Sequence, residues 1–160
     1  MRKGITMKKI VTSGLLLAAL LGLSGCGEEK KPAPAKPAAA AFDLTKAKDG
    51  TYTAESASDS YMGRGRLTVV IKDHKIVAAD FVGLSPDGKV KDDTYGMTDG
   101  QIKDERKYKI AQSALKANNS YGAQLIETQK PGEVDAIAGA TVSYDQFMET
   151  AQNVLEQSQK

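Results

Sequence analysis

Residues 66–82 read RLTVVIKDHKIVAADFV, and this stretch decides the fold. Its first arm, Arg66 to Lys72, is rich in β-branched residues, which favour strands. Asp73 and His74 then turn the chain, and a second β-prone arm follows from Lys75 to Val82. Two such arms around a short polar turn predict an antiparallel hairpin.

The segments on either side of this hairpin add a strand upstream and a loop downstream. Asp49-Gly50 is a turn signal, and Thr51 to Ala54 is a short β-prone run after it. The basic, glycine-rich segment 63–66 is interpreted as the start of a strand and not as a phosphate-binding loop, because no helix follows it. Residues 83–100 contain Pro86 and four glycines and are expected to form a loop.

Helical patterns follow this loop. The first begins near Lys103, and its apolar residues recur at three- and four-residue spacing: Tyr108, Ile110, Ala111, Ala114 and Leu115. Asn118-Asn119 is expected to stop or interrupt this helix. A second helical stretch is expected from Tyr121 to Gln129, with its inward face formed by Ala123, Leu125 and Ile126. Pro131-Gly132 ends it.

The last helix is expected to begin at Ser143, because Ser143 and Gln146 have the spacing of a capping box. Its expected buried face comprises Phe147, Ala151, Val154 and Leu155. Strands followed by helices predict an α+β fold, in which helices pack on one face of a small antiparallel sheet. One domain, residues 48–160, accommodates all of these elements.

The N-terminus is predicted to be a lipoprotein signal peptide, residues 1–25. Four basic residues precede an apolar run from Ile10 to Leu23. This run is shorter than the roughly 20 residues that span a bilayer, as is typical of an export signal. Leu23-Ser24-Gly25-Cys26 resembles a lipobox, so Cys26, the single cysteine of the chain, is the expected lipidation site. The alternative is an ordinary secretory signal with a cysteine there by chance.

Residues 26–47 are interpreted as the lipidated cysteine and a tether rich in proline, alanine and lysine. Such a composition favours extended polyproline II structure, and about 20 residues would reach about 60 Å. The formal net charge of +2 includes the four basic residues of the signal peptide, so the remainder carries about −2. A basic surface for nucleic acid is therefore not expected.

The stretch Asp135 to Ser143 contains the main candidate for chemistry. Thr141 supplies a hydroxyl that the small residues before it leave accessible. Gly139 permits backbone angles that are closed to other residues and lets a ligand approach the main chain. The helix predicted to follow would present free N–H groups and a positive dipole end, which suit a phosphate.

Residues 134–147 resemble the FMN-binding domain family, including its bacterial surface-lipoprotein branch. Further similar segments are Asp49 to Tyr52, Lys72 to Val77 and Leu125 to Lys130, so the resemblance covers most of residues 48–157. The resemblance implies that Thr141 carries FMN through a phosphoester, placed there from FAD by an FAD:protein FMN transferase with magnesium. Asp135, Ala138, Gly139, Ala140 and Ser143 are the accompanying cofactor-site positions, and position 138 is Ala where the family usually has Ser or Thr.

By this resemblance the chain is expected to be an electron carrier anchored at the extracytoplasmic face of the cell membrane, or at an outer membrane if the cell has one. Its expected partners are the transferase and a membrane quinone-linked dehydrogenase or another redox protein. The resemblance implies an electron-transfer protein rather than an enzyme that turns over its own substrate. The alternatives are a non-redox surface lipoprotein that binds a small ligand, peptide or protein, and an exported signal peptide that is itself the signal.

Other residues with reactive or aromatic side chains are given structural interpretations. His74, the only histidine, is expected to be a solvated turn residue, because the chain has no second histidine and only one cysteine, Cys26, which is too few for a zinc site. Tyr95-Gly96-Met97 is expected to anchor its loop rather than contact a flavin, and Tyr121 and Tyr144 are interpreted in the same way. Three acidic residues in the long loop do not match an EF-hand and are expected to be solvated: Asp87, Asp92 and Asp93.

Overall fold

The computed structural model describes residues 43–160. The predicted signal peptide, Cys26 and most of the predicted tether lie outside the described residues. Within residues 43–160, no helix is long and apolar enough to cross a membrane, and no group of three or more potential metal ligands forms.

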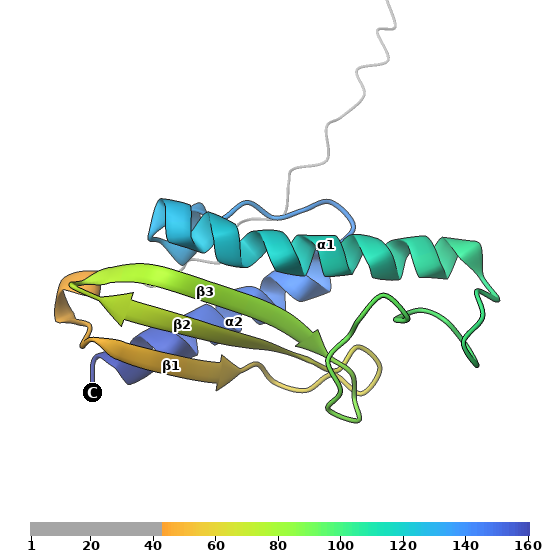
Figure 1. Ribbon diagram of the computed structural model, residues 1–160, viewed down its shortest axis with the longest axis horizontal. Coiled ribbons are helices and arrows are strands. Elements are labelled where there is room, and N and C mark those ends of the chain that lie inside the picture. The colour runs from red at the N-terminus through yellow and green to blue at the C-terminus, as the bar shows by residue number, and fades with distance from the viewer. Residues whose placement is uncertain (1–42) are drawn as a thin grey trace, which may run out of the picture. The chain divides into compact units, whose positions relative to one another are not determined.

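Three strands form one antiparallel sheet in the order β1-β2-β3 (Figure 1). They are β1 (Gly50–Glu55), β2 (Arg64–Lys72) and β3 (Lys75–Leu84). The predicted hairpin is confirmed as β2 and β3, with Lys72 paired to Lys75. Asp73 and His74 both have positive φ, 50° and 58°, which is the backbone of the two-residue turn that matches strand twist.

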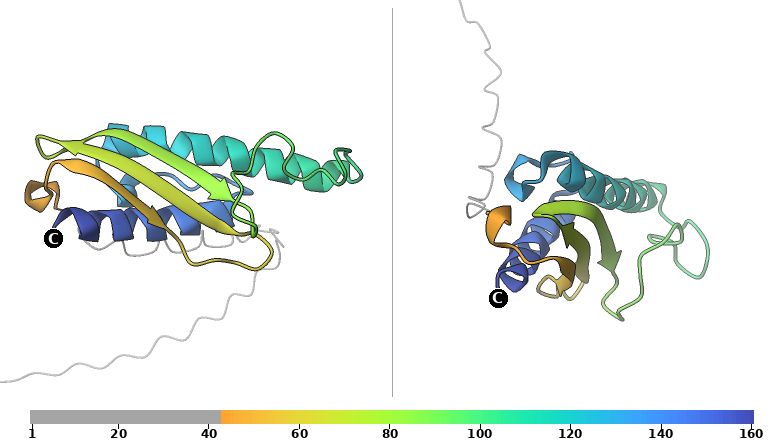
Figure 2. Two further views of the ribbon diagram at one scale, coloured as in Figure 1. Left: turned by 60° about the horizontal axis from the view of Figure 1, so that its bottom comes forward. Right: turned by 60° about the vertical axis from the view of Figure 1, so that its left-hand side comes forward.

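Two helices cover one face of this sheet. Helix α1 (Glu105–Thr128) lies along β3, and α2 (Thr141–Ser158) packs on β1 and β2 (Figures 1 and 2). The ring of Phe81 on β3 lies 6.1 Å from Tyr121 of α1 and 5.4 Å from Phe147 of α2, so both helices meet the same side of the sheet. The predicted α+β class, with helices on one face, is confirmed.

Helix α1 is continuous, so the interruption predicted at Asn118-Asn119 is wrong. Asn118 is buried in the middle of the helix. With its amide nitrogen toward Ser143, it donates to the Ser143 hydroxyl and the Ala114 carbonyl, while its oxygen accepts from the Gly83 N–H. These tertiary partners offset the modest intrinsic cost of asparagine in a helix.

Two residues predicted to face inward from the second half of this helix do not do so. Ala123 is exposed and Ile126 is 38% exposed, whereas Leu125 is fully buried. Because the stretch continues the long helix Glu105–Thr128, its buried face follows Ala117, Tyr121 and Leu125, at four-residue spacing.

Helix α2 begins at Thr141, so the capping box predicted at Ser143 and Gln146 is also wrong. The Tyr144 N–H donates to the Ala140 carbonyl, which makes Ala140 the N-cap residue. Gln146 instead turns inward and donates to the Gly63 carbonyl. The buried face predicted for this helix is confirmed, with Phe147, Ala151 and Val154 all inaccessible and Leu155 5% exposed.

The start of the described chain packs against the end of α2. Ala47 is buried, and the Lys48 N–H donates to the Ser158 carbonyl at 2.8 Å. The N-terminal end of the domain therefore lies at the C-terminal end of α2, which leaves the opposite end of that helix free to form a site.

Candidate functional site

A cavity of about 510 Å³ lies at the N-terminal end of α2, and we call it the Thr141 cavity. Four segments line it: Met62 after β1, Tyr95 and Gly96 before α1, the motif residues 139–143, and four residues of α1, which are Lys107, Ile110, Ala111 and Ala114. The N-terminal half of α1 and the loop before it project past the end of the sheet (Figure 1). The site therefore lies beyond the sheet, where loops and not strands complete its walls.

The loop that leads to Thr141 is held by both helices. From α1, the Gln124 side chain accepts from the Asp135 N–H at 2.9 Å, and the Tyr121 hydroxyl accepts from the Ile137 N–H at 3.5 Å. From α2, the Tyr144 hydroxyl donates to the Val134 carbonyl at 3.2 Å. The motif backbone is thus held by hydrogen bonds from both helices.

Gly139 has φ +82°, and an added Cβ there would meet no atom within 4 Å. The glycine is therefore required by the backbone angle and not by crowding, as expected from the sequence. Ala138 and Asp135 are exposed. The hydroxyl that Ala138 lacks relative to the usual family residue would consequently face solvent or a partner, and its absence leaves no buried polar group unpaired.

The first turn of α2 offers unpaired backbone donors beside the Thr141 hydroxyl. Thr141 is exposed, and the N-cap Ala140 has no side-chain acceptor for the N–H groups that follow it. These groups carry the positive end of the helix dipole, and the first turn contains no acidic residue to oppose an anion. Lys107 adds a cationic side chain to the same cavity.

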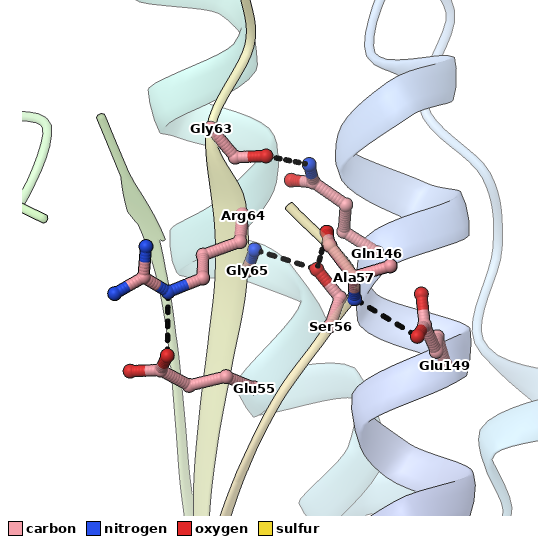
Figure 3. A network of polar contacts seen from close by, with 8 residues as sticks. All are labelled: Glu55, Ser56, Ala57, Gly63, Arg64, Gly65, Gln146 and Glu149. Carbon is pink, nitrogen blue, oxygen red and sulfur yellow. Dashed lines mark hydrogen bonds and ion pairs between the residues drawn. The ribbon is translucent and has the colours of Figure 1, made fainter. Parts of the chain in front are cut away.

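Met62 reaches the cavity because the loop after β1 is tied to α2 (Figure 3). The Gln146 side chain donates to the Gly63 carbonyl at 3.1 Å, and the Glu149 carboxylate accepts from the Ala57 N–H at 2.9 Å. The residue that the capping-box pattern had assigned to a helix end therefore fixes a wall of the site.

Another wall comes from the loop before α1. Gly96 has φ +94°, and a Cβ there would lie 2.8 Å from the Ala111 methyl group, so only glycine lets this loop approach α1 so closely. The Gln112 side chain donates to the Tyr95 carbonyl at 3.1 Å. Tyr95 and Gly96 thus line the cavity as well as anchoring the loop, whereas the sequence analysis favoured anchoring alone.

Tyr121 and Tyr144 belong to the core. Their rings lie 5.8 Å apart, and burial raises the pKa of both hydroxyls above the ordinary value. For Tyr144, the nearby carboxylates of Asp135 and Asp145 raise the pKa further. The structural interpretation of these two tyrosines is consistent with this packing, and His74 is exposed at its turn, as expected.

The acidic residues of the long loop cap their own turns. Asp87 accepts from the Lys89 N–H, and Asp92 accepts from the Thr94 N–H and hydroxyl. The Lys89 side chain and then its N–H lower the pKa of the Asp87 carboxyl group, and the Thr94 hydroxyl and then its N–H lower that of Asp92. Turn capping thus accounts for their positions without an ion.

Several lining residues were not identified from the sequence. Met62 and Lys107 come from segments distant from the motif and carry no local signal. Ile110 was placed on the buried face of the first helix, yet it is 52% exposed and faces the cavity. The sequence offered one signal for Ile110: the apolar face of this helix is wider than the surface that the sheet can cover.

Comparison with known proteins identifies the family. The sequence profile described as FMN-binding domain matches residues 60–156. A comparison with curated proteins gives no match. Among solved structures, a Clostridium perfringens protein is 28% identical, with a TM-score of 0.56, over 70% of this chain and 88% of that protein. A Clostridium thermocellum protein is 25% identical, with a TM-score of 0.42, over 71% of this chain and 93% of that protein.

Proposed function

The chain belongs to the FMN-binding domain family, and we propose that it is an extracytoplasmic electron carrier with FMN joined to Thr141 by a phosphoester. The observation that carries this proposal is the exposed Thr141 hydroxyl at the first turn of a helix, at the rim of an apolar cavity. The oxygen that would be attached, the site for the FMN phosphate and the site for the flavin ring would therefore adjoin one another.

The residues present fit the two halves of FMN. A cavity of about 510 Å³ is within the range of small-molecule sites, and its lining of aliphatic side chains, Met62 and Tyr95 suits a planar aromatic ring system. The free N–H groups of the first turn of α2 suit a phosphate, and Lys107, whose exposed ammonium lies 3.9 Å from the Asp104 carboxylate, lines the same cavity.

Attachment requires one group transfer. The Thr141 oxygen attacks the phosphorus on the flavin side of FAD, and the pyrophosphate bond breaks. AMP leaves with the bridging oxygen, and the hydroxyl proton is released. The FAD:protein FMN transferase and its magnesium would supply catalysis, since the Thr141 cavity lining contains no side chain suited to act as a base: Lys107 is its only titratable group besides Tyr95.

Once bound, the flavin supplies the redox chemistry, and the chain supplies attachment, position and electrostatics. The hydrogen bonds of Gln124, Tyr121 and Tyr144 hold the motif loop. Ile110, Ala111 and Ala114 line the cavity and would cover one side of the flavin ring. Lipidation at Cys26 and the tether up to residue 47 would keep the domain within reach of a membrane quinone-linked dehydrogenase.

The test is the intact mass of the protein coexpressed with the transferase. The wild type should gain the mass of FMN less water, and Thr141→Ala should gain nothing. Ala138→Ser restores the usual family residue at an exposed position, so it should be modified at least as fast as the wild type, with unchanged stability. A wild type without the mass increment would contradict the proposal and favour the non-redox lipoprotein. An increment that survives Thr141→Ala would contradict attachment at Thr141.

A further inference from the structure

Lys91 contacts both of the loops that wall the Thr141 cavity. Its ammonium donates to the Met62 carbonyl at 2.5 Å and lies 4.5 Å from the centroid of the Tyr95 ring. Met62 and Tyr95 line the cavity from two different loops, one after β1 and one before α1. One side chain therefore joins the Met62 wall, which α2 holds, to the Tyr95 wall, which α1 holds, near the place where Leu84 pairs with both Arg64 and Val90.

The position of Lys91 is itself fixed. Its N–H donates to the Gly83 carbonyl at 2.9 Å, and a Cβ at Gly83 would lie 3.0 Å from the Lys91 Cδ. The aliphatic stem thus crosses the end of β3 at a residue without a side chain. From there the charged group reaches the Met62 carbonyl and the ring of Tyr95.

The charge at this place is half-buried. Burial lowers the pKa of Lys91, and the carboxylate of Asp59 opposes that effect. The Asp59 carboxylate is itself occupied, because it accepts from the Tyr61 and Met62 N–H groups at 2.8 and 2.7 Å. The groups in direct contact with the ammonium are a neutral carbonyl and an aromatic ring, and the Asp59 carboxylate, which keeps its own negative charge, offsets part of the positive charge.

We propose that Lys91 is a positioning residue of the flavin site, which joins the two loops and holds a positive charge behind the Tyr95 ring. This inference rests on the proposed function. Uptake of two electrons and one proton leaves the flavin ring system with one negative charge. A cation held nearby favours that product over the neutral oxidised form, and it raises the reduction potential.

Three substitutions separate the two roles of Lys91, which are the link between the Met62 and Tyr95 loops and the positive charge. Lys91→Arg keeps both, Lys91→Gln keeps a donor for the Met62 carbonyl without the charge, and Lys91→Met removes both. Lys89→Met is the matched control, because Lys89 lies in the same loop, is exposed and pairs only with Asp87 at 3.1 Å.

The charge is tested by the potential of the flavin-loaded proteins, titrated with dithionite against reference dyes. The equilibrium constant for two-electron reduction should fall about tenfold in Lys91→Gln and Lys91→Met, which is about 30 mV. Lys91→Arg and Lys89→Met should match the wild type. A wild-type potential in Lys91→Gln, or a lowered potential in Lys91→Arg, would overturn the role of the charge.

The link between the two loops is tested without flavin, by amide hydrogen exchange in the Thr141→Ala background. Lys91→Met should speed exchange in the segments around Met62 and Tyr95, and Lys91→Gln should not. An unchanged exchange rate in Lys91→Met would overturn the proposal that Lys91 links the two loops. This measurement remains decisive if the wild type carries no FMN, in which case the proposed function fails independently, and a melting curve identifies any variant that does not fold.

Discussion

Gly139 and Gly100 form a natural pair at the scale of single residues. Both have left-handed backbone angles, φ +82° and +72°, and neither has an atom within 4 Å of an added Cβ. Alanine in this conformation costs about 1 kcal/mol or somewhat more, with no steric clash to add. Only Gly139 lies in the motif, so the pair separates backbone strain in general from strain at the attachment site.

We predict that Gly139→Ala and Gly100→Ala each lower the free energy of unfolding by about 1 kcal/mol. Gly139→Ala should also slow FMN attachment, because relief of the strain moves the residues that present Thr141. Urea denaturation measures the first effect, and the time course of the mass increment measures the second. Equal attachment rates in the two variants would show that the motif backbone does not need this conformation.

At the scale of elements, the close approach of α1 to β3 depends on Gly122. A Cβ there would lie 2.5 Å from the Ala79 carbonyl oxygen, which belongs to the backbone and does not move aside easily. Alanine in a helix gains about 1 kcal/mol over glycine, so propensity and packing act in opposite directions. We expect the steric clash to outweigh the gain in helix propensity, because neither the strand nor the 24-residue helix can shift easily.

Gly122→Ala should therefore lower the free energy of unfolding by about 1–3 kcal/mol, despite its better helix propensity. Ser113→Ala is the control in the same helix, because Ser113 is exposed and its hydroxyl bonds only to the Lys109 carbonyl. Its effect should stay within about 0.5 kcal/mol. Stabilisation by Gly122→Ala in urea denaturation would mean that α1 can move off the sheet without loss.

The same elements show what the sequence can predict. The β2–β3 hairpin is predictable because alternation and a two-residue turn are local signals. The continuity of α1 is not, since the partners of Asn118 are Gly83 and Ser143, both distant in the chain. The start of α2 was misplaced for a related reason: Gln146 matches a capping box locally, but its partner is the Gly63 carbonyl.

The candidate site also has a part that local sequence predicts and a part that depends on contacts between distant segments. The motif residues are contiguous in sequence and their resemblance to the family marks them, so Thr141 and Gly139 could be proposed as site residues from the sequence, and both line the cavity. The walls of the cavity come from four segments, and Met62, Lys107 and Tyr95 meet the motif only after the helices have packed. The resemblance indicates the proposed attachment residue, and the tertiary structure shows what surrounds it.

At the scale of the whole molecule, one aromatic cluster joins the sheet, both helices and the motif loop. Tyr121 stacks on Phe147 with ring centroids 5.2 Å apart, and the Tyr144 ring meets Tyr121 edge to face, with centroids 5.8 Å apart. Burial raises the pKa of Tyr121 and Tyr144 above the ordinary value of 10.0. Folding thus depends on keeping two phenols protonated in the core.

The sign of the resulting pH dependence follows from linkage. Below about pH 10 both phenols are protonated in the folded and the unfolded chain, so their contribution to stability is fully present. Above that pH the unfolded chain releases protons first, and stability falls as pH rises towards the raised pKa values of the folded state. Each tyrosine adds a slope of at most about 1.4 kcal/mol per pH unit in this range.

We predict that Tyr121→Phe and Tyr144→Phe each flatten the loss of stability above pH 10, measured by urea denaturation at a series of pH values. Tyr144→Phe should cost about 1 kcal/mol at neutral pH, because the Val134 carbonyl loses its donor. Tyr121→Phe should cost less, since its hydrogen bond from Ile137 is long, at 3.5 Å. Tyr61→Phe, at an 87% exposed position, should keep the wild-type slope. If all three variants lost stability as steeply as the wild type, the alkaline limit would lie in groups other than the two phenols that connect the helices to the motif loop.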